Sequence, residues 1–329
     1  MSASSLNTPN KENVPYKSHQ AVLFSGQGSQ RHGMGKMLAE ADREAMDLWK
    51  LAEKLSGLPL REIYWDGDEA AQADTRAVQP ALTVFNFNLW RKFRNQLNPF
   101  AMAGHSLGEF SALAASGALA PEDAISITAL RGRLMAEADP NGTGAMAAIV
   151  RLPDSVVQKI VDDTVAESGE ILVAANFNTP VQTVISGSKH AVEMAGQKAK
   201  QLKGRSVPLK VSGAFHSPLM AEANREFVPW LEKLDWRDPR IPVFVNAGAA
   251  SVRTGADARA AIARQMISPV KWTDVITNLY ESGARQWVEI GPRAVLSKML
   301  EPILAIQQVD MGEHSVDILN SFQQGITPG

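Results

Sequence analysis

Short apolar runs and longer helical repeats alternate along the first half of the chain. Residues 21–25 form an apolar run that stops at the glycine loop Gly26-Gln27-Gly28. A helical repeat follows, and a second apolar run, residues 100–103, comes after a further helical segment that Gln79-Pro80 introduces. Because a helix follows each strand, the pattern predicts a parallel sheet covered by helices.

The same alternation continues beyond the second apolar run. Helical periodicity resumes at Leu107 and stops at Gly117, a residue type that commonly ends helices, and Pro121 opens the next helix. Nearer the end of the chain, residues 286–290 form another short apolar run after two more helical segments. The two ends of the chain therefore contribute to one sheet.

The middle of the chain has a different order of predicted strands and helices. Strand and helix patterns follow one another there in the order βαββαβ, which is the ferredoxin-like split motif. We therefore predict an inserted ferredoxin-like subdomain at residues 141–211, and a discontinuous α/β domain at residues 19–140 and 212–310. Residues 1–18 and 311–329 are predicted to be tails. The six segments of the motif are residues 144–150, 154–165, 171–175, 181–186, 191–202 and 207–211.

The composition is that of a globular protein with a sizeable core, since 45% of the 329 residues are hydrophobic. A formal net charge of -2 gives no general attraction to nucleic acid or to a membrane surface, so neither is expected as a partner. Residues 1–18 lack the apolar centre of a signal peptide, and no later run reaches the length of a membrane span. A cytoplasmic location is therefore expected.

The absence of cysteine narrows the chemistry that the chain can perform. Disulfides, thiolate metal sites and cysteine nucleophiles are all excluded. The six histidines show no paired metal-binding spacing, so no metal is expected. The reacting groups must be oxygen or nitrogen.

The second apolar run ends in a match to the G-x-S-x-G nucleophile elbow, Gly104-His105-Ser106-Leu107-Gly108. In such an elbow a sharp turn between strand and helix exposes the serine hydroxyl, and the glycines avoid collisions across the turn. Ser106 is therefore the predicted nucleophile. The amide of Leu107, at a helix N-terminus, is predicted to donate to an oxyanion.

A serine nucleophile needs a base, and His216 is the best candidate among the histidines. It lies in a segment that leaves a strand and enters a helix, so it can face the elbow across a cleft. By spacing alone, an ordinary loop histidine is an equally good interpretation. His105 adjoins the nucleophile and is expected to point to the other side of the turn.

Five segments, in order along residues 21–306, together resemble the signatures of malonyl-CoA:acyl carrier protein transacylases. They are Phe24-Ser25-Gly26-Gln27-Gly28-Ser29-Gln30, Gly104-His105-Ser106-Leu107-Gly108-Glu109, Leu130-Arg131-Gly132, Gly142-Thr143-Gly144-Ala145-Met146 and Ala214-Phe215-His216-Ser217. The resemblance implies an α/β-hydrolase-like domain with a ferredoxin-like insertion. It also implies transfer of malonyl from malonyl-CoA to the phosphopantetheine thiol of an acyl carrier protein, with no bound cofactor.

The resemblance implies roles for individual residues as well. Ser106 corresponds to the acylated nucleophile and His216 to its base, while Gln27 matches the glutamine beside the oxyanion site. Gln265 matches a loop glutamine whose backbone carbonyl orients the histidine. Arg131 matches the arginine that pairs with the malonyl carboxylate, for which a guanidinium fork suits better than lysine.

Other interpretations of these positions stay open from the sequence alone. Spacing favours an outward-facing Arg131, and the segment around Gln27 is also compatible with a polar turn. Asn176 and Asn178 resemble residues that line the coenzyme A cleft, but a turn between two strands is nearly as well supported. With His105, these two asparagines complete the predicted substrate contacts.

The same residues leave rival functions to test. A serine thioesterase or hydrolase would use the same elbow with water as acceptor, and the acyltransferase subunit of a malonate-processing complex would share every residue named. A carrier-binding protein without transfer activity is a third alternative. The sequence does not separate fatty-acid from polyketide synthesis.

Overall fold

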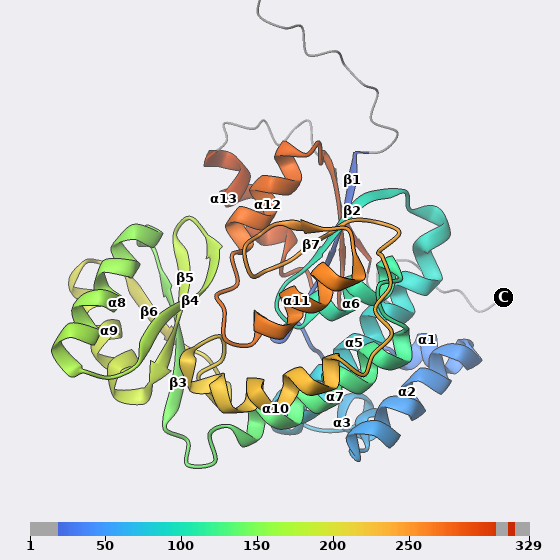
Figure 1. Cartoon of the computed structure of the whole chain (residues 1–329), viewed down its shortest axis with the longest axis horizontal. Coiled ribbons are helices and arrows are strands. Elements are labelled where there is room, and N and C mark those ends of the chain that lie inside the picture. Colours follow the sequence, from blue (N-terminus) through green and yellow to red (C-terminus); the bar gives the residue numbers. More distant parts are fainter. Residues whose placement is uncertain (1–18, 307–314, 320–329) are drawn as a thin grey trace, which may run out of the picture.

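A computed structural model, describing residues 19–306 and 315–319, contains two β-sheets (Figure 1). The larger sheet has the strand order β10-β9-β1-β2-β7-β8. Its hydrogen-bonded neighbours are parallel except β7 and β8, as the alternating pattern predicted. The strands are β1 (Gln20–Phe24), β2 (Pro99–Gly104), β7 (Val243–Phe244), β8 (Ser251–Val252), β9 (Gln286–Ile290) and β10 (Ser315–Leu319).

Helices cover both faces of the larger sheet. Residues of β1 alternate between two buried apolar clusters: Val22 and Phe24 belong to one, Ala21 and Leu23 to the other. The helices outside the smaller sheet are α1 (Lys36–Ala41), α2 (Arg43–Ser56), α3 (Leu60–Trp65), α4 (Glu69–Ala73), α5 (Thr75–Phe93), η1 (Arg94–Gln96), α6 (Gly108–Ser116), α7 (Pro121–Glu137), η2 (Pro218–Met220), α10 (Ala221–Leu231), α11 (Gly255–Gln265), α12 (Trp272–Glu281) and α13 (Ser297–Ile306).

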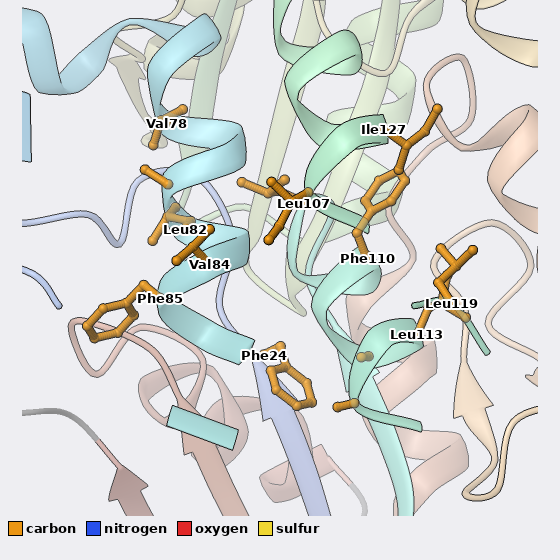
Figure 2. Close-up of a cluster of buried hydrophobic side chains, with 14 of the residues drawn as sticks. Phe24, Val78, Leu82, Val84, Phe85, Leu107, Phe110, Leu113, Leu119 and Ile127 are labelled. Carbon is orange, nitrogen blue, oxygen red and sulfur yellow. The ribbon is translucent and has the colours of Figure 1, made fainter. Parts of the chain in front are cut away.

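The cluster that contains Phe24 fixes the helix that follows the elbow. In Figure 2, Leu107 lies between α5 and α6, whereas Phe110 points towards Ile127 and Leu113 lies near Leu119; all belong to the same buried cluster as Phe24. Leu107 and Phe110 are at most 1% exposed. Packing of this kind holds the N-terminal end of α6 rigidly over the end of β2.

The smaller sheet is formed wholly by the middle of the chain, on one side of the molecule (Figure 1). Its strand order is β4-β5-β3-β6, and all neighbours are antiparallel. This is the ferredoxin-like arrangement, so the predicted fold class is confirmed. The boundaries at residues 141 and 211 stay a prediction. The elements are β3 (Gly144–Val150), α8 (Asp154–Ser168), β4 (Leu172–Thr179), β5 (Gln182–Ser188), α9 (Lys189–Gln201) and β6 (Arg205–Pro208).

Two N-terminal helices begin where the sequence pattern did not place them. Pro80 was expected to introduce a helix, yet it lies inside α5, which begins at Thr75 because the Asp74 side chain accepts from the amide of Arg76. The first helical repeat splits into α1 and α2 because Asp42 caps α2 in the same way. In both places a capping side chain, more than hydrophobic periodicity, sets the boundary.

The predicted C-terminal tail is wrong over five residues. Residues 315–319 of the predicted tail 311–329 form β10, an edge strand that pairs in parallel with β9. This strand forms by main-chain hydrogen bonds to a strand some thirty residues earlier, and the hydrophobic periodicity of so short a segment does not indicate such pairing. The other predicted tail, residues 1–18, lies outside the described residues. Within the described part of the chain, no helix is both long and apolar enough to cross a membrane.

Candidate active site

Ser106 lies on a strained turn between β2 and α6. Its φ is 48°, in the left-handed region that non-glycine residues seldom occupy. A Cβ on Gly104 would lie 2.0 Å from the carbonyl carbon of Gly108, and one on Gly108 would lie 2.1 Å from the carbonyl oxygen of Phe24. These distances confirm why the turn needs both glycines, and the turn is the predicted nucleophile elbow.

His216 lies against the serine hydroxyl, with 2.7 Å between Ser106 Oγ and His216 Nε2. The other ring nitrogen, Nδ1, is 3.0 Å from the carbonyl oxygen of Gln265 and 3.1 Å from that of Ser268. Carbonyl oxygens only accept, so Nδ1 carries the hydrogen and Nε2 is left to accept from the serine. The arrangement is a nucleophile paired with an oriented base, and carbonyls take the place of an acidic third member.

Burial keeps the His216 ring neutral. The side chain is 4% exposed, and burial, helped by the positive charge of Arg131, lowers its pKa from 6.5 to about 3. The carbonyls that accept from Nδ1 oppose this shift. A neutral imidazole can take a proton from Ser106 at neutral pH.

Arg131 of α7 faces inward, against the outward position that spacing favoured. It is 1% exposed, and its two terminal nitrogens donate to Gln79 Oε1 at 2.8 Å and to Gln265 Oε1 at 2.9 Å. Burial lowers its pKa to about 10, so the guanidinium is still charged at neutral pH. Among the residues that the structure describes, no carboxylate lies within ion-pair distance of it. Its charge is therefore available to a bound anion.

Two backbone amides beside the nucleophile can serve an oxyanion. In the described part of the chain, the amides of Gln27 and Leu107 have no hydrogen-bond acceptor, and both residues line the cavity at Ser106. The amide of Ser106 itself donates to Asn246 Oδ1 at 2.6 Å. The Gln27 side chain donates to Thr75 Oγ1 at 3.2 Å, which orients its loop.

Ser106, His216 and Arg131 all line one cavity of about 210 Å³ between the two sheets. Polar and apolar side chains share its lining, which suits an acyl group with one charged end. The other residues that line it are Gly26, Gln27, His105, Leu107, Met135, Met146, Ala148, Asn176, Asn178, Gln182, Val184, Leu209, Val211, Phe215, Val295, Leu296 and Met299.

Three predicted substrate contacts lie in this cavity, though not in the way the sequence suggested. His105 was expected on the far side of the turn, yet its Nε2 lies 2.8 Å from Asn178 Oδ1 and its ring contacts Trp272 edge-on. Asn176 and Asn178 belong to β4, not to a turn, and the register of β4 shifts near both. These irregularities let the strand turn neighbouring side chains towards the cavity.

Sequence reasoning missed three polar residues that support the site. Asn246, just after β7, accepts a hydrogen bond from the amide of Ser106 and donates one to the carbonyl of Gly104. The Glu109 carboxylate accepts hydrogen bonds from Asn246 and Gln265. Gln79 accepts a hydrogen bond from Arg131. Glu109 could have been noticed, because an acidic residue follows the elbow directly. Asn246 carries no local signal, since its partners are about 140 residues away.

Known acyltransferases resemble this chain over most of its length. Residues 22–316 match the acyl transferase domain family. The malonyl CoA-acyl carrier protein transacylase of Bacillus subtilis is 40% identical over 86% of this chain and 90% of its own, and that of Haemophilus influenzae is 37% identical over 92% and 96%.

Solved structures agree with these relatives. An acyl carrier protein S-malonyltransferase from Vibrio cholerae superimposes with a TM-score of 0.84 at 35% identity, covering 92% of this chain and 97% of its own. A malonyl-transacylase in complex with a type II PKS acyl-carrier protein gives 0.85 at 35% identity, over 92% and 96%. These similarities extend over both sheets, well beyond the elbow.

Proposed function

The chain belongs to the acyl transferase domain family, and from that premise we propose that it transfers malonyl from malonyl-CoA to the phosphopantetheine thiol of an acyl carrier protein. The relatives named above carry this activity in their names. The acyl group passes through an ester on Ser106, so the reaction is a ping-pong acyl transfer that supplies fatty-acid or polyketide synthesis.

In the first half of the reaction, malonyl moves from sulfur to oxygen. His216 Nε2 takes the proton from Ser106 Oγ, and the oxygen attacks the thioester carbonyl of malonyl-CoA. The amides of Gln27 and Leu107 donate to the oxyanion of the tetrahedral intermediate. When the carbon–sulfur bond breaks, the proton on His216 passes to the departing coenzyme A thiolate.

In the second half, the carrier's thiol takes the place of coenzyme A. His216 accepts the thiol proton, the sulfur attacks the malonyl-serine carbonyl, and the carbon–oxygen bond to Ser106 breaks. The proton returns to Ser106 Oγ. The chemistry is complete with these groups and the carrier's own phosphopantetheine, so the scheme calls on no bound cofactor.

One observation carries the choice of malonyl: Arg131, which is buried and has no ion pair among the described residues, shares a cavity with the Ser106–His216 pair. Neutral side chains alone hold its terminal nitrogens, and a malonyl carboxylate can accept two parallel hydrogen bonds from a guanidinium. Asn176, Asn178 and His105 are proposed to contact the rest of the substrate from the opposite wall.

The rival functions make different use of the same site. A thioesterase or lipase-like hydrolase has no need of a cation facing its nucleophile, so Arg131 argues against it. An acyltransferase subunit of a malonate-processing complex shares every residue, and differs only in the carrier that it serves. A cytoplasmic location stays a prediction.

The transferase and the hydrolase are separated by following coenzyme A release from malonyl-CoA with and without carrier protein. We expect steady release only when the carrier bears its phosphopantetheine thiol, and a single turnover without it. The apo-carrier is the control, since it offers the same surface without a thiol. Steady release in the absence of any carrier would identify a hydrolase instead.

A further inference from the structure

Glu109 is a buried carboxylic acid that the proposed reaction does not use. It lies in the first turn of α6, three residues after Ser106, with 0% of its surface exposed. Its Oε2 accepts from Gln265 Nε2 at 3.1 Å and from the backbone amide of Asn246 at 3.2 Å. Its Oε1 has no partner within the described residues. Burying an acid with so few partners costs stability, so stability alone does not explain it.

A second buried glutamate shows what a purely structural role looks like. Glu289, 1% exposed, accepts three backbone hydrogen bonds, from Val295, Leu296 and Ser297, at 2.7 to 2.9 Å. That carboxylate caps the start of α13 with backbone partners alone. Glu109 instead receives one of its two hydrogen bonds from a side chain that reaches the reaction centre.

That side chain belongs to Gln265, and Glu109 is one of three groups that fix its orientation. Its amide nitrogen donates to Glu109 Oε2 and, at 2.9 Å, to the carbonyl oxygen of Ser106, and its amide oxygen accepts from Arg131 at 2.9 Å. Neither of the first two oxygens has a hydrogen to offer when Glu109 is ionised. If the Gln265 amide were flipped, its oxygen would face the oxygens of Glu109 and Ser106, and its NH₂ group would face the Arg131 guanidinium, which is also a donor.

We propose that Glu109 is a positioning residue for malonyl recognition. It fixes the side-chain amide of Gln265, which in turn holds the Arg131 guanidinium where it can bind the carboxylate of a malonyl group on Ser106. This inference rests on the proposed function. It adds a selectivity role for a residue that touches neither acyl group nor coenzyme A. Because the backbone carbonyl of Gln265 also orients His216, one residue connects the base with the malonyl clamp.

The proposed role does not depend on the charge of Glu109. Burial raises its pKa to about 7, while the hydrogen bonds from Gln265 and Asn246 and the charges of Arg131 and Arg264 oppose that shift. In the neutral acid the proton can sit on the unpartnered Oε1, leaving Oε2 to accept from Gln265 as before. A glutamine at this position would present its carbonyl oxygen in the same way.

The test measures kcat/KM for acylation of Ser106 by malonyl-CoA and by acetyl-CoA, and follows their ratio. In Glu109→Leu, which has no acceptor, we expect the malonyl-to-acetyl ratio to fall about tenfold, as for one lost hydrogen bond to a charged network. Glu109→Gln should restore the ratio. Ser116→Ala is the matched control, because Ser116 is equally buried on α6 and, among the described residues, its hydroxyl bonds only to the carbonyl of Leu113.

A double variant tests whether Glu109 acts through Gln265. In a Gln265→Met background, which keeps the backbone carbonyl for His216, adding Glu109→Leu should not lower the ratio further. Equal losses for malonyl and acetyl in Glu109→Leu, or a fully additive double variant, would overturn the proposal. If Glu109→Leu does not fold, Glu109→Asp replaces it, since the shorter acid keeps the charge but cannot reach Gln265. Failure of the proposed function would look different, because the wild type itself would then either accept no malonyl or release coenzyme A steadily without any carrier.

Discussion

The ferredoxin-like sheet and the cluster around Ser106 are held together by different kinds of contact. The smaller sheet packs aliphatic side chains such as Ile149 and Ile185 against residues of α8 and α9 such as Val192, in an apolar core of its own. At the site, two non-glycine residues, Ser106 and His216, have a positive φ. Arg131 and Glu109 are buried there, and neither has an ion pair within the part of the chain that the structure describes. The first region is built for stability, whereas the second keeps strained and charged groups ready for a ligand.

The largest effect should come from removing the buried guanidinium. Arg131→Ala should lower acylation by malonyl-CoA about a hundredfold, because two charge-assisted hydrogen bonds to the substrate carboxylate are lost, while acylation by acetyl-CoA is retained. Initial rates of Ser106 acylation with each coenzyme A ester measure this.

Arg133→Ala is the matched control for that substitution. Arg133 lies on the same helix but pairs at the surface with Glu137 and Glu226, so its loss should leave both rates unchanged. A parallel loss of malonyl and acetyl rates in Arg131→Ala would show that the arginine supports the fold and not the choice of substrate.

A smaller effect concerns the stability cost of keeping His216 neutral. Its pKa is about 3 in the folded protein, against 6.5 for the ordinary group, so on acidification below 6.5 the unfolded state binds a proton that the folded state does not. Stability must therefore fall as the pH falls through that window, by up to about 1.4 kcal/mol per pH unit from this group.

Urea unfolding at several pH values, for wild type and His216→Gln, measures that contribution. The variant should show a shallower loss of stability on acidification, because it removes the buried group that the unfolded state protonates. Identical slopes for wild type and His216→Gln would contradict a neutral, buried base.

The smallest effect on catalysis should come from the core of the smaller sheet. Ile185 is fully buried there, so Ile185→Ala should lower the free energy of unfolding by about 2 to 4 kcal/mol through the cavity that it leaves. The preference for malonyl over acetyl should not change. A shift in that preference would show that the two regions are energetically coupled.

The same contrast explains what could be predicted from the sequence. The strand boundaries of β3 and β9 match the prediction, because their apolar runs and turns are local signals. The nucleophile elbow was also indicated by a local signal, its G-x-S-x-G pentapeptide. The structure brings Ser106, His216, Arg131 and Gln265 together, as the family resemblance implied. Their roles in the reaction remain proposals.

The supporting residues could not be predicted in this way. Asn246 bonds to Gly104, Ser106 and Glu109 across 137 to 142 residues, and no pattern in a single sequence indicates such partners. The inward direction of the Arg131 side chain likewise depends on distant partners, because it donates to Gln79 and Gln265, which lie on two other helices. Such polar contacts between distant segments are fixed by tertiary packing and not by local periodicity.

The most direct test of Ser106 as the acylated nucleophile is the intact mass of the protein after mixing with malonyl-CoA. We expect the wild type to gain one malonyl group, to lose it when holo-carrier protein is added, and to carry it on Ser106 in a peptide digest. Ser106→Ala should gain nothing. An adduct that persists in Ser106→Ala, or one that water removes as fast as the carrier does, would contradict acyl transfer through this serine.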